Sequence, residues 1–526
     1  MHRLATLTVS AVFAASPVLA QHDHAIAGQA LGAVSFPTSC ASAVQPRIDR
    51  AVAMLHSFWF DEAHNMFVEI AAEDSTCAMA HWGIAMTAWG NPFVRQPIAA
   101  EQQRVGLAAA EHAISLAGRA SHRERMYIEA AAVLWRDAAQ LDHLARLGRH
   151  ESAMKSLNDA HPDDSEAAIF HARAIIANAP PTDLDSRRQL HAAAILEPLF
   201  AMQPDHPGLA HYVIHAFDSP RLASHGLEAA RRYASIAPAA PHALHMPSHI
   251  FTRLGYWDES IETNRRSAAA EPDSNAAVHP NDYMVYAYLQ QGRDAEAWKV
   301  IARTRGTVDR FYGAVLGYNA VAMQARYALE RSAWREAAML AVPGGSAPFI
   351  EAVARFARAI GAARSADVAS AGVEVAALAT LRDTLKARND GYWATIVEAQ
   401  RLAAAAWIAR AQGRVEDAVR LAREGADLEE TVEKHPVTPG PLLPARELEG
   451  DLLLELGRSN DAMLAFEATL AREPGRARAL FGIARAAEKA GNAAVARARY
   501  IELLDLMRRA DSSRVEVRVA REYLDR

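Results

Sequence analysis

The stretch GRSNDAMLAFEATLAREPGRARALFGIARAAEKAGNAAVARARY, residues 457–500, matches itself when it is shifted by 34 residues. At this offset glycine meets glycine, alanine meets alanine and aromatic meets aromatic, in the pairs Gly457 and Gly491, Ala462 and Ala496, and Phe466 and Tyr500. Small residues let two helices approach closely, and the aromatic fills the space beside the next pair. The stretch therefore predicts an all-α, helix–turn–helix solenoid, an α–α superhelix.

The same pattern recurs upstream with less regular spacing. The related stretches are AQGRVEDAVRLA around Gly413, QQGRDAEAW around Gly292, RLGYWDESIETN around Gly255, ARLGRHESAM around Gly148 and SFWFDEAHNMF around Ala63. Proline- and glycine-rich breaks at residues 342–348 (VPGGSAP) and 435–444 (HPVTPGPLLP) separate the helical stretches. We expect an extended segment at 21–45, a first array at 46–342 and a second at 349–526.

The composition suits this fold. Alanine is abundant, aromatic residues make up 7% and charged residues 22% of the 526-residue chain, and β-branched runs are scarce. The net charge is −6, and no long basic stripe is present. We therefore expect no nucleic-acid partner.

The first twenty residues have the form of a secretory signal peptide. A short basic start is followed by an apolar run and by the small-residue cleavage pattern Val18-Leu19-Ala20. We expect a periplasmic or secreted protein with no transmembrane segment in its mature part. In such a compartment Cys40 and Cys77, the two cysteines of the chain, are expected to form a disulfide; two unpaired thiols are the alternative.

Histidines concentrate in one part of the chain. Seven of the 22 histidines lie between residues 206 and 249. His211 and His215 are four residues apart and therefore share one helical face. His242, His245 and His249 follow at spacings of three and four, with Pro247 expected to kink their helix. In a solenoid the two groups lie on neighbouring first helices and converge on the concave face.

The sequence thus predicts a site for a divalent transition metal. The expected ligands are His211, His215, His245 and His249, with His242 in reserve. Nitrogen-rich ligation favours zinc or copper over nickel, and disfavours calcium and magnesium. Four residues are possible further ligands or supporting groups: Asp218, His279, Asp282 and His56.

Two alternatives stay open for these residues. The histidines can serve as hydrogen-bonded structural groups or as a pH-sensitive groove without a metal. Tyr283 and Tyr286 can line a groove beside the histidines or simply pack within the repeat.

Several stretches resemble exported bacterial tetratricopeptide-repeat (TPR) proteins, a group mostly without assigned function. They include LHSFWFDEA, CAMAHWGIAM, HYVIHAFD, APHALHMPSHIFTRLGYWDESI, DYMVYAYLQQGR and EKHPVTPGPLLPARELEGDLLLELGR. The resemblance covers most of the mature chain and implies the repeat fold, but no catalytic role.

Three functions follow as hypotheses. The first is an exported metal-binding repeat protein, for metal handling or metal-dependent chemistry. The second is an interaction scaffold that holds a protein or peptide partner in its concave groove without metal. The third is a metalloenzyme with an open coordination position. The sequence contains no GxSxG or P-loop motif that would favour serine-nucleophile or nucleotide chemistry.

Overall fold

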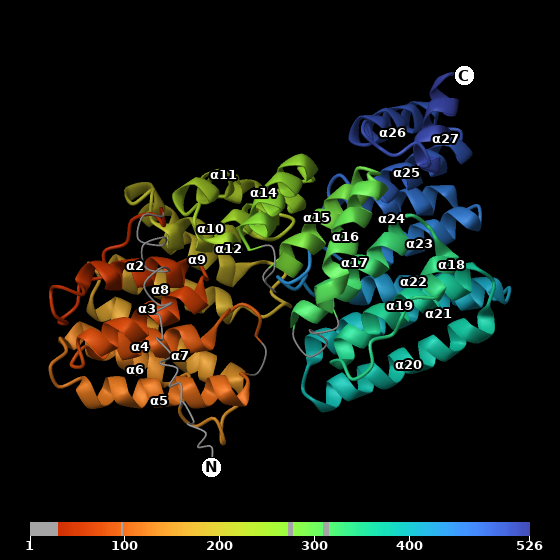
Figure 1. The fold of residues 1–526 in the computed structure, drawn as a ribbon. Helices are drawn as coiled ribbons and strands as arrows, with labels where there is room; N and C mark the ends of the chain where they lie inside the picture. The colour runs from red at the N-terminus through yellow and green to blue at the C-terminus, as the bar shows by residue number, and fades with distance from the viewer. Residues whose placement is uncertain (1–29, 96–97, 272–276, 309–314) are drawn as a thin grey trace, which may run out of the picture.

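The computed structural model describes residues 30–95, 98–271, 277–308 and 315–526. The expected signal peptide, residues 1–20, and the first part of the 21–45 segment lie outside these ranges. Within them the chain is all-α, without a strand, as predicted. Its helices follow one another as TPR-like helix–turn–helix pairs (Figure 1).

The first helices form a curved stack at the N-terminal side of the molecule (Figure 1). They are α2 (Gln45–His56), α3 (Phe60–Glu73), α4 (Ala78–Trp89), α5 (Ala100–Leu116), α6 (His122–Ala132), α7 (His143–Ala160), α8 (Ser165–Ala177) and α9 (Arg187–Met202). The next elements carry the histidine-rich region. They are α10 (Pro207–Phe217), η1 (Ala223–Gly226), α11 (Leu227–Ile236), α12 (Pro241–His245), α13 (Pro247–Arg253), α14 (Trp257–Ala270) and α15 (Val278–Gln290).

The remaining helices form the C-terminal part. They are α16 (Asp294–Val308), α17 (Val315–Glu330), α18 (Trp334–Ala338), α19 (Pro348–Arg364), α20 (Val368–Ala387), α21 (Gly391–Ala411), α22 (Val415–Glu429), α23 (Ala445–Glu455), α24 (Ser459–Arg472), α25 (Ala477–Lys489), α26 (Ala493–Leu506) and α27 (Val515–Leu524). One buried core extends from Tyr318 past Phe349 to Ala486, so the core does not divide at the 342–348 break.

The 34-residue repeat has the expected physical basis. Gly457 and Gly491 follow the ends of α23 and α25 with φ values of 77° and 75°, a left-handed conformation that suits glycine. Phe466 of α24 is fully buried, and it packs where α25 has a glycine, Gly482. The aromatic of one helix thus occupies the space left by a small residue on the next.

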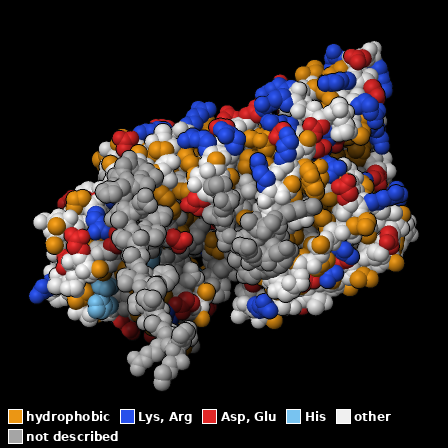
Figure 2. Space-filling view, viewed as in Figure 1, with side chains coloured by type: hydrophobic (Ala, Val, Ile, Leu, Met, Phe, Trp, Pro, Cys, Tyr) orange, Lys and Arg blue, Asp and Glu red, His pale blue; other side chains and the backbone are white. Residues whose placement is uncertain are grey.

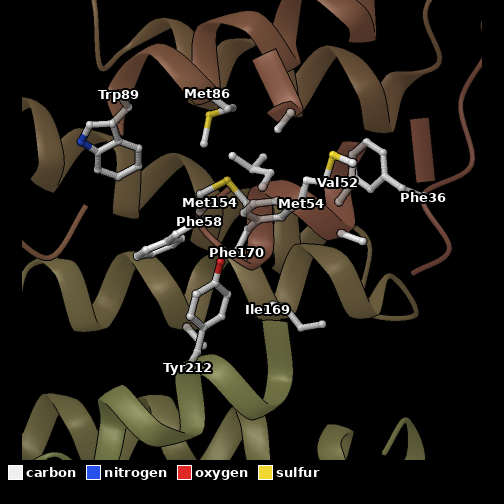
Figure 3. Close-up of a cluster of buried hydrophobic side chains, with 14 of the residues drawn as sticks. Phe36, Val52, Met54, Phe58, Met86, Trp89, Met154, Ile169, Phe170 and Tyr212 are labelled. Atoms are coloured by element: carbon white, nitrogen blue, oxygen red, sulfur yellow. The ribbon is translucent and has the colours of Figure 1, made fainter. Parts of the chain in front are cut away.

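The segment before α2 is attached to the first repeats. Cys40 and Cys77 form a disulfide, and the Phe36 ring stacks on Trp82 with centroids 5.1 Å apart. Figure 3 shows the core behind them, where Tyr212 of α10 points toward Phe58 and Phe170. These contacts hold α10, which carries two histidines of interest, against α2 and α8.

The surface in Figure 2 mixes basic and acidic side chains, and on this face no basic stripe runs along the helices. No helix in the described ranges is long and apolar enough to cross a membrane.

Exchanging one glycine for alanine tests the repeat packing. A Cβ atom on Gly482 would lie 2.5 Å from the Phe466 ring, so we predict that Gly482→Ala lowers the free energy of unfolding by about 1–3 kcal/mol. Gly372, inside α20, has no neighbour within 4 Å of such a Cβ. Gly372→Ala should therefore stabilise the protein by up to about 1 kcal/mol, because alanine favours the helix. Denaturant unfolding measures the stability of both variants. Equal changes in the free energy of unfolding would contradict the packing of Phe466 against Gly482.

Candidate metal centre

Six histidine side chains from four helical segments meet inside the molecule. His211 and His215 come from α10, His242 and His245 from α12, His249 from α13 and His279 from α15. A proline begins α13 directly after Met246, and this break separates His249 from the α12 pair. The structure thus brings together all five expected ligands and His279, which the sequence named as a possible further ligand.

The first triad consists of His211, His215 and His242. One ring nitrogen from each lies within 4.8 Å of the other two. The Nε2 atoms of His211 and His242 are 3.2 Å apart. His215 has a buried Nε2 without a hydrogen-bond partner among the described residues. The Phe58 ring packs against His211 and His242, with centroids at 4.4 and 5.2 Å, and closes the apolar side of this triad.

The second triad consists of His245, His249 and His279, whose candidate ligand atoms also lie within 4.8 Å of one another. The Nε2 atoms of His245 and His249 are 3.1 Å apart. His279 has a buried Nδ1 without a hydrogen-bond partner among the described residues. The hydroxyl of Tyr283 lies 3.4 Å from His249 Nδ1 and 3.2 Å from the carbonyl of Thr438, which accepts its hydrogen.

Hydrogen bonds to Nδ1 determine which ring nitrogens are free. His249 Nδ1 lies 2.8 Å from the Asp218 carboxylate, which can only accept a hydrogen bond. His245 Nδ1 lies 2.6 Å from Asn264 Oδ1, and the Asn264 amide nitrogen donates to the Ser260 carbonyl, which fixes the amide orientation. Both rings therefore carry their hydrogen on Nδ1 and present an unprotonated Nε2.

His211 is oriented in the same way by the backbone. Its Nδ1 donates to the carbonyl of His56 over 2.6 Å. This carbonyl ends α2, where helix geometry leaves acceptors without an intrahelical donor. The chain then turns at Phe58 with a φ of 54°, a conformation uncommon outside glycine. The turn brings the Phe58 ring onto the first triad.

Asp218 lies at the centre of a buried charge network. Its carboxylate accepts from His249 Nδ1, from Arg253 Nε at 2.9 Å and from Lys434 Nζ at 3.0 Å. Burial alone would raise the pKa of Asp218, but the Lys434 and Arg253 charges lower it well below its usual value. The carboxylate is therefore ionised, and it orients a ring in place of acting as a ligand.

Burial keeps the cluster neutral. It lowers the pKa of five rings well below the usual histidine value, and neighbouring histidines lower it further: His211, His215, His242, His245 and His279. Burial also lowers the pKa of His249, although Asp218 opposes the shift. Neutral imidazole is the form that binds metals.

A cavity of about 620 Å³ lies beside the cluster. His215 and Asp218 form part of its wall, together with Lys434. Its other walls come from α19, α21 and the loop before α5, and they include Phe93 and Trp393. The first triad is thus next to a space large enough for a small organic molecule.

The other candidate residues have different roles. His56 donates from Nε2 to Glu166, which also accepts from His206, so this buried trio is satisfied internally and supports α10. Asp282 pairs with Arg326 at 3.2 Å and accepts from Asn319, away from both triads. The expectation that Asp282 is a further ligand or a supporting group is therefore wrong.

Of the two tyrosines, only Tyr283 adjoins the histidines. Tyr286 is fully buried, and its hydroxyl accepts from Arg476 over 3.1 Å, so it does not line an open groove. Sequence reasoning also missed Asn264 and the loop at residues 430–444. This loop supplies Lys434 and the Thr438 carbonyl, and its proline-rich composition was the available signal.

Protonation of the cluster should destabilise the metal-free protein. In the unfolded chain histidines gain protons near pH 6.5, but the buried rings gain them only at much lower pH. The unfolded state then binds more protons, so stability falls as pH drops below about 6.5. We predict a loss of at most about 1.4 kcal/mol per pH unit for each such histidine. Urea unfolding of the metal-free protein at several pH values measures this slope, and a flat profile from pH 7 to 5 would contradict it.

Comparisons with known proteins identify distant structural likeness only. No family model and no curated protein matches the sequence. A structure of the APC/C hetero-tetramer Cut9–Hcn1 has 11% identity and a TM-score of 0.31, over 92% of this chain and 89% of that one. Monomeric mutants of IFIT1, with m7Gppp-AAAA or Gppp-AAAA, have 11% and 12% identity and TM-scores of 0.37, over 86% of this chain and 95% of theirs. The function therefore has to be argued from the site.

Proposed function

We propose that this protein is an exported TPR-like repeat protein that binds a transition metal through its six clustered histidines. The contact between His245 and His249 carries the proposal. Both rings have their hydrogen on Nδ1, so two lone pairs face each other at 3.1 Å. Such an approach is repulsive unless a cation lies between them.

The observed spacing fits shared ligation. Two nitrogens that bind one zinc ion at about 2.0–2.1 Å lie about 3.3 Å apart at the tetrahedral angle. The Nε2 pairs of the two triads are separated by 3.1 and 3.2 Å. Structural hydrogen bonding explains the Nδ1 contacts, but it leaves the lone pairs and the unpartnered nitrogens of His215 and His279 without a function.

The ligand set favours zinc or copper. All six donors are neutral imidazoles, which suit zinc and copper(II), and nickel less well. Calcium and magnesium require oxygen ligands, and the nearest carboxylate, Asp218, is held by Arg253 and Lys434. The cysteine sulfurs form a disulfide and are not donors.

Metal-dependent chemistry is the better supported use of this metal. Three histidines leave a coordination position open, and the cavity meets the first triad at His215. A closed storage site would have no need of such a cavity. The signal-like N-terminus supports placing this activity in the periplasm or outside the cell.

A scaffold that binds a protein or peptide in its groove is the alternative, and the repeat architecture favours it in general terms. His211, His245 and His249 are, however, at most 1% exposed. They cannot act as polar contacts to a docked peptide. A partner could occupy the cavity, but the histidine cluster would still need its own explanation.

Removing one ligand from each triad should abolish tight metal binding. We predict that His211→Ala combined with His249→Ala loses most of the bound metal after equilibration with Zn²⁺ and gel filtration, as measured by elemental analysis. The matched control is His191→Ala combined with His225→Ala, because these two histidines are exposed and belong to neither triad. Full metal content in the cluster variant would contradict the proposal, as would an equal loss in the control.

Removing the charge of Asp218 should weaken binding without removing a ligand. We predict that Asp218→Asn lowers zinc affinity about 10–100-fold, because His249 loses the carboxylate that orients it. Asp282→Asn changes another buried carboxylate, one that contacts no triad histidine, and should leave affinity unchanged. Competition with a chromophoric chelator gives both affinities, and thermal unfolding checks that the variants are folded. Equal zinc affinities for the two variants would show that Asp218 does not support metal binding.

A further inference from the structure

The six histidines form two groups of three, and they do not surround a single point. Within each triad one candidate ligand atom from each histidine lies within 4.8 Å of the other two. Within each triad one Nε2 pair has the spacing of two ligands on one ion, at 3.2 Å in the first and 3.1 Å in the second. Each triad therefore groups three candidate nitrogen ligands, and two of the three have the spacing of ligands on one ion.

The two triads are also neighbours. Rings of different triads approach to 5.7 Å between His215 and His249, and to 5.8 Å between His242 and His245. These centroid separations are shorter than the 6.1 Å between His249 and His279 within the second triad. Two ions, one in each triad, would be close enough to share a ligand.

We infer that each chain holds two metal ions, one bound by His211, His215 and His242 and the other by His245, His249 and His279. The inference rests on the proposed function and specifies its site. Two-metal centres in proteins have ions about 3.5–4 Å apart and place a shared ligand between them.

Charge determines what the shared ligand is. Histidine binds a metal as neutral imidazole, and the carboxylate that contacts the cluster, Asp218, is already balanced by Arg253 and Lys434. Two divalent ions would thus place four positive charges in a buried site without a protein anion as ligand. A small inorganic anion such as hydroxide would bridge the pair and offset part of this charge.

The cavity offers a route to this centre. Phe58 covers the first triad on its apolar face, and Tyr283 covers the second. The cavity meets the cluster at His215, whose ring lies 4.1 Å from that of Phe93 on the cavity wall. An exogenous ligand therefore reaches the ion of the first triad before that of the second.

The number of zinc ions bound per chain tests whether the protein holds two metal ions. Metal-free protein is equilibrated with Zn²⁺, freed of loose metal and analysed for zinc per chain. Two ions per chain are expected in the wild type, and one ion each in His211→Gln and in His279→Gln. One ion in the wild type would overturn the pair and leave the proposed metal binding intact. No retained zinc would overturn both.

Loading the protein with copper tests whether the two ions share a bridging ligand. After loading with Cu²⁺, a bridged pair should show an electron paramagnetic resonance signal that integrates to clearly fewer than two spins per chain. His279→Gln, which retains the first triad alone, should give one uncoupled spin. Two full spins in a wild-type chain that holds two coppers would contradict a shared ligand. Circular dichroism of each variant confirms the helical fold, and the wild-type result stands without the variants.

Discussion

Hydrogen bonds to Nδ1 are the interactions on which this site depends. A carboxylate, a side-chain amide and a backbone carbonyl each hold one ring, at His249, His245 and His211. Each bond places the hydrogen on the outer nitrogen and directs the inner lone pair toward a neighbouring ring. Without these acceptors the rings could change tautomer and pair with each other, and the cluster would be an ordinary buried hydrogen-bond network.

The helical repeat makes this arrangement possible. Its pairs place α10, α12, α13 and α15 side by side, so that rings from four segments meet without a long loop. The acceptors that orient the rings come from other helices or from a helix end. The His56 carbonyl is in the last turn of α2, Asn264 is in the middle of α14, and Asp218 follows the end of α10. The loop at residues 430–444 then closes the site from the C-terminal part, because Lys434 pairs with Asp218 and the Thr438 carbonyl contacts Tyr283.

Local sequence patterns predicted much of this molecule. The 34-residue match of Gly457 with Gly491 predicted the helix pairs, since helix packing within one repeat depends on residues close in sequence. The spacing of His211 and His215 likewise predicted a shared helical face. Contacts between distant segments were harder. Tyr283 and Thr438 are 155 residues apart, and their meeting depends on the curvature of the whole array.

The same reasoning explains why Asp282 was misjudged, whereas His279, also named as a possible ligand, does join the cluster. Asp282 and His279 are three residues apart on α15, and the sequence treated them alike. Only the structure distinguishes their directions, because Arg326 of α17 draws Asp282 away while His279 faces α12. The direction of the Asp282 side chain depends on Arg326, which lies 44 residues further along the chain. A local sequence pattern does not show such a distant contact.

The central claim is that the inward-facing Nε2 atoms of His245 and His249 bind a metal ion. Anomalous diffraction from crystals of the zinc-loaded protein, collected on both sides of the zinc absorption edge, tests it most directly. The account predicts a peak about 2.0–2.1 Å from both Nε2 atoms. Zinc only at exposed histidines such as His191 or His225, with none between these two rings, would contradict it.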